Sequence, residues 1–113
     1  MSKRLTVPVA VWSQLGPVPV QLTTPVHVED GEPRSQKLMG KYEPHQRRIV
    51  VDSAMAHLAQ VQCAWHEAVH CWLLDAGVRL GKQEETVVDL IANAIVNTLA
   101  GGTVAEPPKR KRR

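Results

Sequence analysis

The pattern of apolar and polar residues changes its period once along the chain, close to Asp52. Before this point, short runs rich in β-branched residues are separated by turn sequences containing proline or glycine, which is typical of β-strands. These runs lie at residues 5–12, 18–22, 26–29, 38–42 and 49–51. After it, apolar residues recur every three or four positions, which indicates amphipathic helices. The pattern therefore predicts a strand region followed by a helical region.

Two helices are predicted in the second half of the chain. The first covers residues 53–76, contains neither glycine nor proline, and has Asp52 or Ser53 as its N-cap and Gly77 as its end. The second covers residues 83–100. A short loop between them favours an antiparallel hairpin, which brings the start of the second helix beside the end of the first.

The two regions together predict an α+β fold, in which a small, mostly antiparallel sheet packs on the helical hairpin. Trp65 and Trp72 are seven residues apart on the first helix, so they should form one stripe against the sheet. Proline is poorly suited to a central strand because it has no N–H to donate. Four prolines lie in the early strand runs, at positions 8, 17, 19 and 25. We therefore expect residues 1–36 to form an extended arm and edge strands, and residues 37–52 to form the main strand region.

Length and charge set the limits of this organisation. The chain has 113 residues, enough for one domain with one modest core, which we assign to residues 1–100. Residues 101–113 end in Lys109-Arg110-Lys111-Arg112-Arg113, and this tail accounts for the net charge of +3. Such a tail is expected to be disordered and to touch nucleic acid only weakly, because no aromatic residues interleave with its charges.

The segment His66-Glu67-Ala68-Val69-His70 lies in the middle of the first predicted helix. Residues four apart share one face of a helix, so both imidazoles can bind the same metal ion. Glu67 is turned by about 100° from His66 and can reach a water molecule in an open metal position. This is the HExxH pattern of zinc hydrolases, and its helical setting supports a catalytic metal site with Glu67 as general base.

A catalytic zinc site needs a third protein ligand and keeps its fourth position for water. The start of the second helix offers Glu84, Glu85 and Asp89. Glu85 and Asp89 share a face, so one can bind the metal while the other orients a histidine. We expect Glu85 to be the ligand, with Asp89 as the alternative, and attribute Glu84 to the helix dipole. Cys63 is better explained as a small buried hydrophobe than as a ligand.

His66-Glu67-x-x-His70 followed by Glu85-x-x-x-Asp89 resembles the gluzincin class of zinc metallopeptidases. Residues 38–100 also resemble small zinc-peptidase-like proteins encoded by bacteriophages, which have a Gly-x-Tyr-x-Pro stretch and a strand ending in Asp before the HExxH helix. Here these segments read Gly40-Lys41-Tyr42-Glu43-Pro44 and Arg48-Ile49-Val50-Val51-Asp52. One departure is that only fourteen residues separate His70 from Glu85, fewer than in the larger gluzincins. The resemblance implies a minimal zincin-like domain with one Zn²⁺ per chain, bound by His66, His70 and Glu85.

The expected function is zinc-dependent peptide-bond hydrolysis by a metallopeptidase encoded by a phage or prophage. Zinc would polarise the scissile carbonyl and activate a water, whose proton passes to Glu67 and then to the leaving amine. Tyr42 can help to stabilise the oxyanion, although a strand tyrosine more often packs. Two histidines and a carboxylate also accept iron. The alternative is a non-catalytic, zinc-stabilised structural, assembly or interaction protein of a phage, which would have no need of Glu67.

The expected partners are a peptide or protein substrate, bound along an edge strand beside the metal-binding helix, and other phage proteins. Neither a signal peptide nor a membrane span is predicted. Cys63 and Cys71 lie too far apart on one helix for a disulfide, which suits a reducing cytoplasm, the host's for a phage protein, or a virion. The other histidines, His27, His45 and His57, are expected at surface or packing positions.

Overall fold

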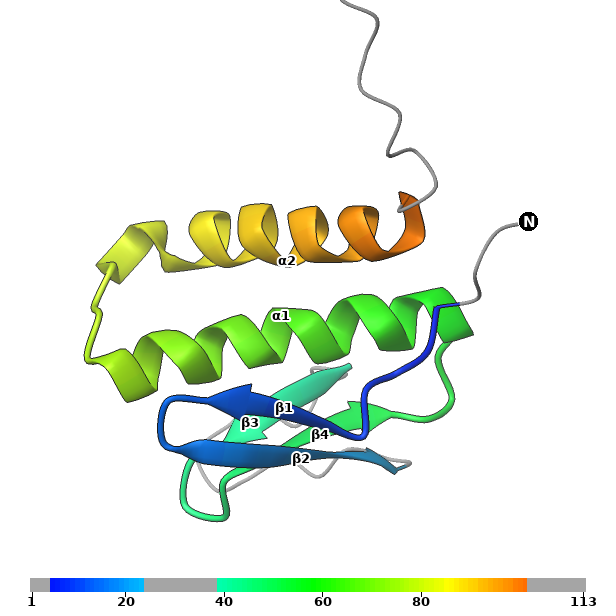
Figure 1. The fold of residues 1–113 in the computed structure, drawn as a ribbon, viewed down its shortest axis with the longest axis horizontal. Coiled ribbons are helices and arrows are strands. Elements are labelled where there is room, and N and C mark those ends of the chain that lie inside the picture. Colours follow the sequence, from blue (N-terminus) through cyan, green and yellow to red (C-terminus); the bar gives the residue numbers. More distant parts are fainter. Residues whose placement is uncertain (1–4, 24–38, 102–113) are drawn as a thin grey trace, which may run out of the picture.

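The computed structural model describes residues 5–23 and 39–101, and it has the predicted α+β fold. Four strands form one sheet, α1 lies across the sheet, and α2 lies on α1 (Figure 1). The elements are β1 (Ala10–Ser13), β2 (Gly16–Thr23), β3 (Gly40–Glu43), β4 (Arg48–Asp52), α1 (His57–Ala76), a 3₁₀ turn η1 (Gly81–Gln83) and α2 (Glu84–Ala100). The expected strand at 26–29, His27 and the tail beyond Gly101 lie outside the described residues.

The strand order in the sheet is β1-β2-β4-β3. Two of the three pairings, β1 with β2 and β3 with β4, are antiparallel, as predicted. The central pairing of β2 with β4 is parallel. β2 joins the two antiparallel pairs because its first half, from Gly16 to Pro19, pairs with β1 and its second half, from Val20 to Thr23, pairs with β4.

The edge position expected from the prolines is found for β1 but is wrong for β2, which lies between two other strands. The hydrogen-bond pattern explains why Pro17 and Pro19 are tolerated there. The N–H of Val20 donates to the carbonyl of Val9 at 3.0 Å, so alternation places both prolines at positions that do not bond to β1. Their nitrogens point to the other side of β2, where pairing with β4 begins only at Val20.

The first helix begins four residues later than predicted, at His57. Neither Ser53 nor Asp52 caps it, because the N-cap is Ala56, which makes no side-chain cap hydrogen bond. The Asp52 carboxylate instead accepts a hydrogen bond from the N–H of Ala54 at 2.9 Å, and its carbonyl accepts one from Met55 at 3.3 Å, which closes a turn before the helix. The end agrees with the prediction, because Gly77 adopts the left-handed conformation (φ 72°) and donates to the carbonyls of the last turn.

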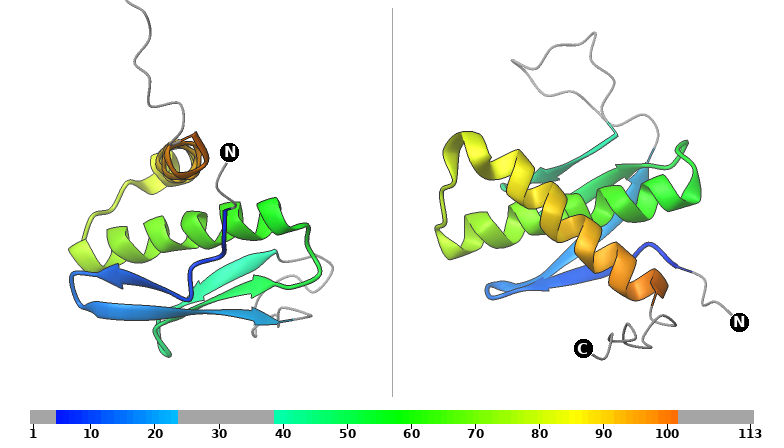
Figure 2. Two further views of the ribbon diagram at one scale, coloured as in Figure 1. Left: turned by 45° about the vertical axis from the view of Figure 1, so that its right-hand side comes forward. Right: turned by 90° about the horizontal axis from the view of Figure 1, so that it is seen from above.

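Helix α1 is the middle layer and has small buried side chains on its sheet side. Ala64, Ala68 and Cys71 pack against strand residues that include Ile49 and Val51. The other contact of α1 is α2, which crosses above it (Figure 2) and buries Val88 and Ala92 against Val69. Trp65 and Trp72 pack against the sheet-side cluster, as predicted, and also against the cluster formed with α2.

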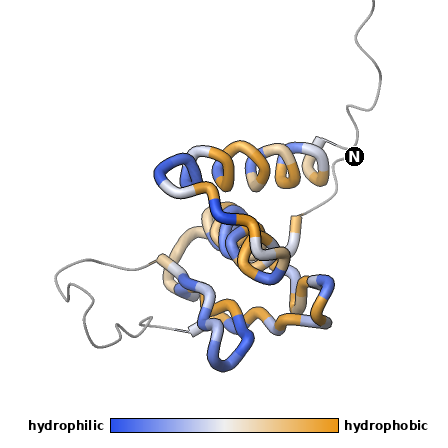
Figure 3. Tube along the Cα trace, turned by 90° about the vertical axis from the view of Figure 1, so that its left-hand side faces the viewer, coloured by the Kyte–Doolittle hydropathy of each residue, from blue (hydrophilic) through white to orange (hydrophobic). Residues whose placement is uncertain are grey.

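Helix α2 contacts the rest of the domain mainly through α1. Its hydrophilic start gives way to mainly hydrophobic residues along its length (Figure 3). Some of these are exposed, including Leu90 and Leu99. Among the helices of the described residues, none is long and apolar enough to cross a membrane.

Candidate metal centre

The two HExxH histidines lie on the side of α1 that faces the start of α2. His66 and His70 are one helical turn apart, with ring centroids separated by 4.9 Å. The loop between the helices and η1 turn the chain back so that α2 begins opposite these rings. The first turns of α2 therefore place Glu84, Glu85 and Asp89 against them.

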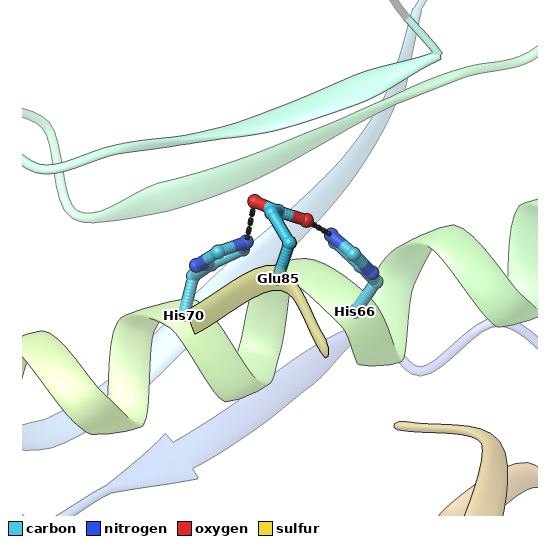
Figure 4. A group of neighbouring side chains, drawn as sticks. All are labelled: His66, His70 and Glu85. Atoms are coloured by element: carbon cyan, nitrogen blue, oxygen red, sulfur yellow. Dashed lines mark ion pairs between the residues drawn. The ribbon is translucent and has the colours of Figure 1, made fainter. Parts of the chain in front are cut away.

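The carboxylate of Glu85 lies between the two imidazole rings (Figure 4). One oxygen, Oε1, is 3.2 Å from Nε2 of His66, and the other, Oε2, is 3.0 Å from Nε2 of His70. One donor atom from each of the three side chains lies within 4.8 Å of the other two. Two imidazole nitrogens and a carboxylate oxygen are a donor set that divalent transition metals accept. The structure thus brings together the three predicted ligands into a group that can hold a metal ion.

The remaining ring nitrogens of the two histidines have partners of their own. Nδ1 of His66 lies 3.0 Å from Oδ1 of Asp89, the residue that the sequence offered as an orienting carboxylate. Nδ1 of His70 lies 2.6 Å from Oε2 of Glu84, for which the sequence predicts only an interaction with the helix dipole. The spacing of residues did not reveal this contact, because it depends on how α2 is rotated about its own axis.

The predicted general base, Glu67, is more shielded than the exposed Glu85. Burial raises the pKa of the Glu67 carboxyl above its ordinary value. His66 and His70 lower this pKa, the charge of Glu85 raises it, and a hydrogen bond from the backbone N–H of Tyr42 lowers it, with burial the largest effect. The bond from Tyr42 ties the carboxylate to β3, whereas the ligands belong to the helices.

A cleft of about 440 Å³ opens beside His66 and Glu67. Its walls come from the start of β3 at Gly40, from α1 at Gln62, and from α2 at Asn93. Of the three candidate ligands only His66 lines the cleft, and Glu67 lies beside it, so a molecule in the cleft can contact both side chains.

Close packing of β3 on α1 forms one wall of this cleft. A Cβ atom on Gly40 would lie only 2.5 Å from Sγ of Cys63 and 2.7 Å from the carbonyl oxygen of Val50. Cys63 itself lines the cleft, and burial raises the pKa of its thiol to about 12, with the charges of Glu67 and Asp52 adding to the effect. The thiol therefore stays protonated, which agrees with its assignment as a packing residue. Cys63 and Cys71 are both free, as predicted.

The hypothesis that Tyr42 stabilises an oxyanion is not supported by the position of its phenol. The hydroxyl accepts a hydrogen bond from Nη1 of Arg47 at 3.4 Å and contacts Cys71. Burial, with a smaller contribution from Cys71, raises the pKa of Tyr42 to about 12. The structure places this side chain with Arg47 and Asp75, and only its backbone N–H with Glu67.

Arg47 and Asp75 form an ion pair that sequence reasoning missed. Arg47 donates through Nη1 to Oδ1 and through Nη2 to Oδ2, each at 3.0 Å, and the hydroxyl of Ser13 donates to the same carboxylate. The pair joins the turns of both antiparallel strand pairs to the end of α1. In the sequence, Arg47 is simply one residue of a polar turn. In the structure, its positive φ of 47° is an unusual backbone conformation for a residue other than glycine.

The histidines outside the motif occupy ordinary positions where the structure describes them. His45 is exposed in the turn between β3 and β4. His57 lies at the start of α1, with Nε2 at 2.6 Å from the carbonyl oxygen of Leu5.

In comparisons with known proteins, no protein-family model, no curated protein and no solved structure matches the chain. The geometry of the group formed by His66, His70 and Glu85 is therefore the main guide to function.

Proposed function

We propose that this chain is a zinc-dependent metallopeptidase, with Glu67 as the general base. The observation that carries the proposal is the convergence of His66, His70 and Glu85 within 4.8 Å, beside a cleft that also exposes Glu67. A closed structural zinc site uses four protein ligands, whereas this group offers three and leaves room for water. The resemblance of residues 38–100 to phage proteins suggests a phage or prophage origin, with the host cytoplasm or the virion as the location.

The residues of the chain divide the chemistry among them. His66, His70 and Glu85 would hold the metal through two nitrogens and a carboxylate oxygen. Bound zinc supplies a Lewis acid for the scissile carbonyl and a water of lowered pKa. The Glu67 carboxylate would accept a proton from that water and return it to the departing amine. The hydrogen bond from the Tyr42 N–H would hold this carboxylate in place for the role.

The proposed substrate is a peptide in extended conformation, bound along the edge strand β3. The N–H of Asp52 donates to the carbonyl of Met39 at 2.8 Å, so alternation directs the N–H and carbonyl of Gly40 and the carbonyl of Tyr42 away from β4, toward the edge of the described sheet. The Tyr42 N–H on this side already bonds to Glu67, so a peptide would use the other three groups. A peptide can add to such an edge through backbone hydrogen bonds. Gly40 lines the cleft together with Glu67, so a chain bound there would pass the metal-binding group.

The test combines metal content with activity. Elemental mass spectrometry of protein purified without added metal should find about one zinc per chain in the wild type and in Glu67→Gln. His66→Ala and Glu85→Ala should lose the metal. Screening with a peptide library should show cleavage by the wild type, and Glu67→Gln should lower kcat/KM by about 10²–10⁴-fold, the usual contribution of a general base.

Two results would contradict the proposal. A wild-type protein that takes up no zinc even when zinc is offered has no such metal centre. Tight zinc binding without cleavage of any peptide would favour the non-catalytic, zinc-stabilised protein instead.

A further inference from the structure

Both histidines of the metal centre are held from two sides. Each presents Nε2 to Glu85, and each has a different carboxylate at Nδ1. Asp89 serves His66 and Glu84 serves His70. A carboxylate at Nδ1 fixes the proton on that nitrogen, so that the lone pair of Nε2 is free for a metal, and it also makes the imidazole a stronger donor.

The position of Glu84 differs from that of a residue that acts only on the helix dipole. A carboxylate that complements the dipole gains little from contacts beyond its own helix and is normally solvated. The Glu84 carboxylate instead reaches across to α1 and makes the shortest of the four histidine contacts, at 2.6 Å. Its side chain is 33% exposed, compared with 70% for Glu85 and 62% for Asp89, so it is the most shielded carboxylate that α2 brings to the centre.

We infer that Glu84 is a positioning residue of the metal centre, acting through His70. The functional pattern on α2 is then Glu84-Glu85-x-x-x-Asp89, in which the middle residue binds the metal and each outer residue orients one histidine. This inference rests on the proposed metal site. Loss of a partner of this kind typically lowers metal affinity by about 10–100-fold.

The role requires both the hydrogen bond and the charge. Glu84→Gln keeps the shape of the side chain, and its amide oxygen can still accept a hydrogen bond from the Nδ1–H of His70, but the change removes the negative charge. Glu84→Ala removes both. The alanine variant should therefore weaken zinc binding more than the glutamine variant, and both should bind more weakly than the wild type.

The negative charge of Glu84 can act through the dipole of α2 or through its contact with His70, and a control variant must distinguish the two. The matched control is the double variant Gln83→Glu/Glu84→Gln, which restores one negative charge to the same end of the helix. Residue 83 is exposed and is the N-cap of α2, so the new carboxylate keeps the dipole interaction from a neighbouring position. This double variant should bind zinc as weakly as Glu84→Gln.

The experiment measures the dissociation constant of Zn²⁺ by competition with a chromophoric chelator, and the visible absorption of Co²⁺ in the same proteins. Thermal unfolding of the metal-free forms checks that each variant is folded. If Glu84→Ala does not fold, the test relies on Glu84→Gln, whose side chain has nearly the same shape as glutamate. We expect about 10–100-fold weaker zinc binding for Glu84→Gln and an altered Co²⁺ spectrum.

The outcomes separate this inference from the proposed function. Wild-type affinity in Glu84→Gln, or its recovery in the double variant, would overturn the positioning role while leaving the metal centre in place. Failure of the wild type to bind zinc would overturn both.

Discussion

Asp75 contacts side chains from three separate segments, although it has no part in the metal centre. Arg47 and Ser13 donate hydrogen bonds to its carboxylate, and the thiol of Cys71 lies 3.7 Å away. Only 5% of the Asp75 side chain is exposed. Because Arg47 also donates to the Tyr42 hydroxyl, this pair helps to hold the strand whose N–H contacts Glu67.

The pair predicts a defined pH dependence of stability. The hydrogen bonds from Arg47, and then that from Ser13, hold the pKa of Asp75 below its ordinary value. A carboxyl with a lowered folded-state pKa stabilises the fold fully above its unfolded-state pKa of about 3.9, and loses this contribution as the pH falls through the folded-state pKa. The wild type should therefore melt at a higher temperature than Asp75→Asn at neutral pH, and the difference should shrink toward about pH 3.

Thermal unfolding of both proteins across this range tests the prediction, since the two proteins differ only at residue 75. Arg47→Gln should show the same narrowing, and adding it to Asp75→Asn should cost little more than either change alone. A difference that stays constant with pH would show that the charge of Asp75 does not contribute.

Among the secondary structure elements, β3 depends most on close approach to a neighbour. Gly40 leaves no room for a side chain against Cys63, and this closeness brings the N–H of Tyr42 to Glu67. Gly40→Ala should push β3 from α1 and lower the free energy of unfolding by about 1–3 kcal/mol, the usual cost of overpacking. Urea unfolding measures this change. The double variant Gly40→Ala/Cys63→Ala should recover part of the loss because the thiol is gone, and no recovery would mean that another contact limits the approach.

The helices were easier to predict from the sequence than the sheet. The spacing of apolar residues and Gly77 define the hairpin, and the HExxH pattern on α1 with Glu85 on α2 predicted the group that the structure assembles. Helical patterns depend on residues close in sequence. The parallel pairing of β2 with β4 joins segments that are distant in the sequence. Pro17 suggested an edge strand, because the sequence of one strand does not show that pairing with its neighbour begins only at Val20.

The same distinction applies within the site. Spacing along one helix places His66 and His70 on one face, so these two candidate ligands can be predicted from the sequence alone. The contact of Glu84 with His70 depends on the rotation of α2 within the hairpin. The hydrogen bond from Tyr42 to Glu67 depends on the distance between β3 and α1, which only tertiary packing determines.

The described domain is built in layers, and α2 is the outermost of them (Figure 1). Within the described residues, α2 buries only Val88, Ala92 and Val96, whereas α1 is enclosed between the sheet and α2. A metal held by His66 and His70 on α1 and Glu85 on α2 would connect the two helices directly. Metal binding would then stabilise the docking of α2 more than it stabilises the sheet.

Removal of the metal should therefore destabilise the docking of α2 on α1 more than the sheet. Amide hydrogen exchange, followed with zinc and after chelation, should accelerate in α2 and at the end of α1, while β2 and β4 change little. Glu85→Ala should resemble the chelated wild type whether or not zinc is present. Equal acceleration throughout the domain would mean that the metal supports the fold as a whole, and no change would mean that α2 docks without it.

Among the described residues, the carboxylates that contact His66 and His70 come from Glu84, Glu85 and Asp89, so these ion pairs all lie within residues 66–89. The backbone N–H that bonds to Glu67 comes from Tyr42, far earlier in the sequence. If the chain is the proposed peptidase, metal binding would depend on residues 66–89 alone, whereas the placement of Glu67 would depend on β3 as well. Mutations that reshape β3 would then change catalysis in a descendant with an intact HExxH motif, and the motif alone would not report whether that descendant is active.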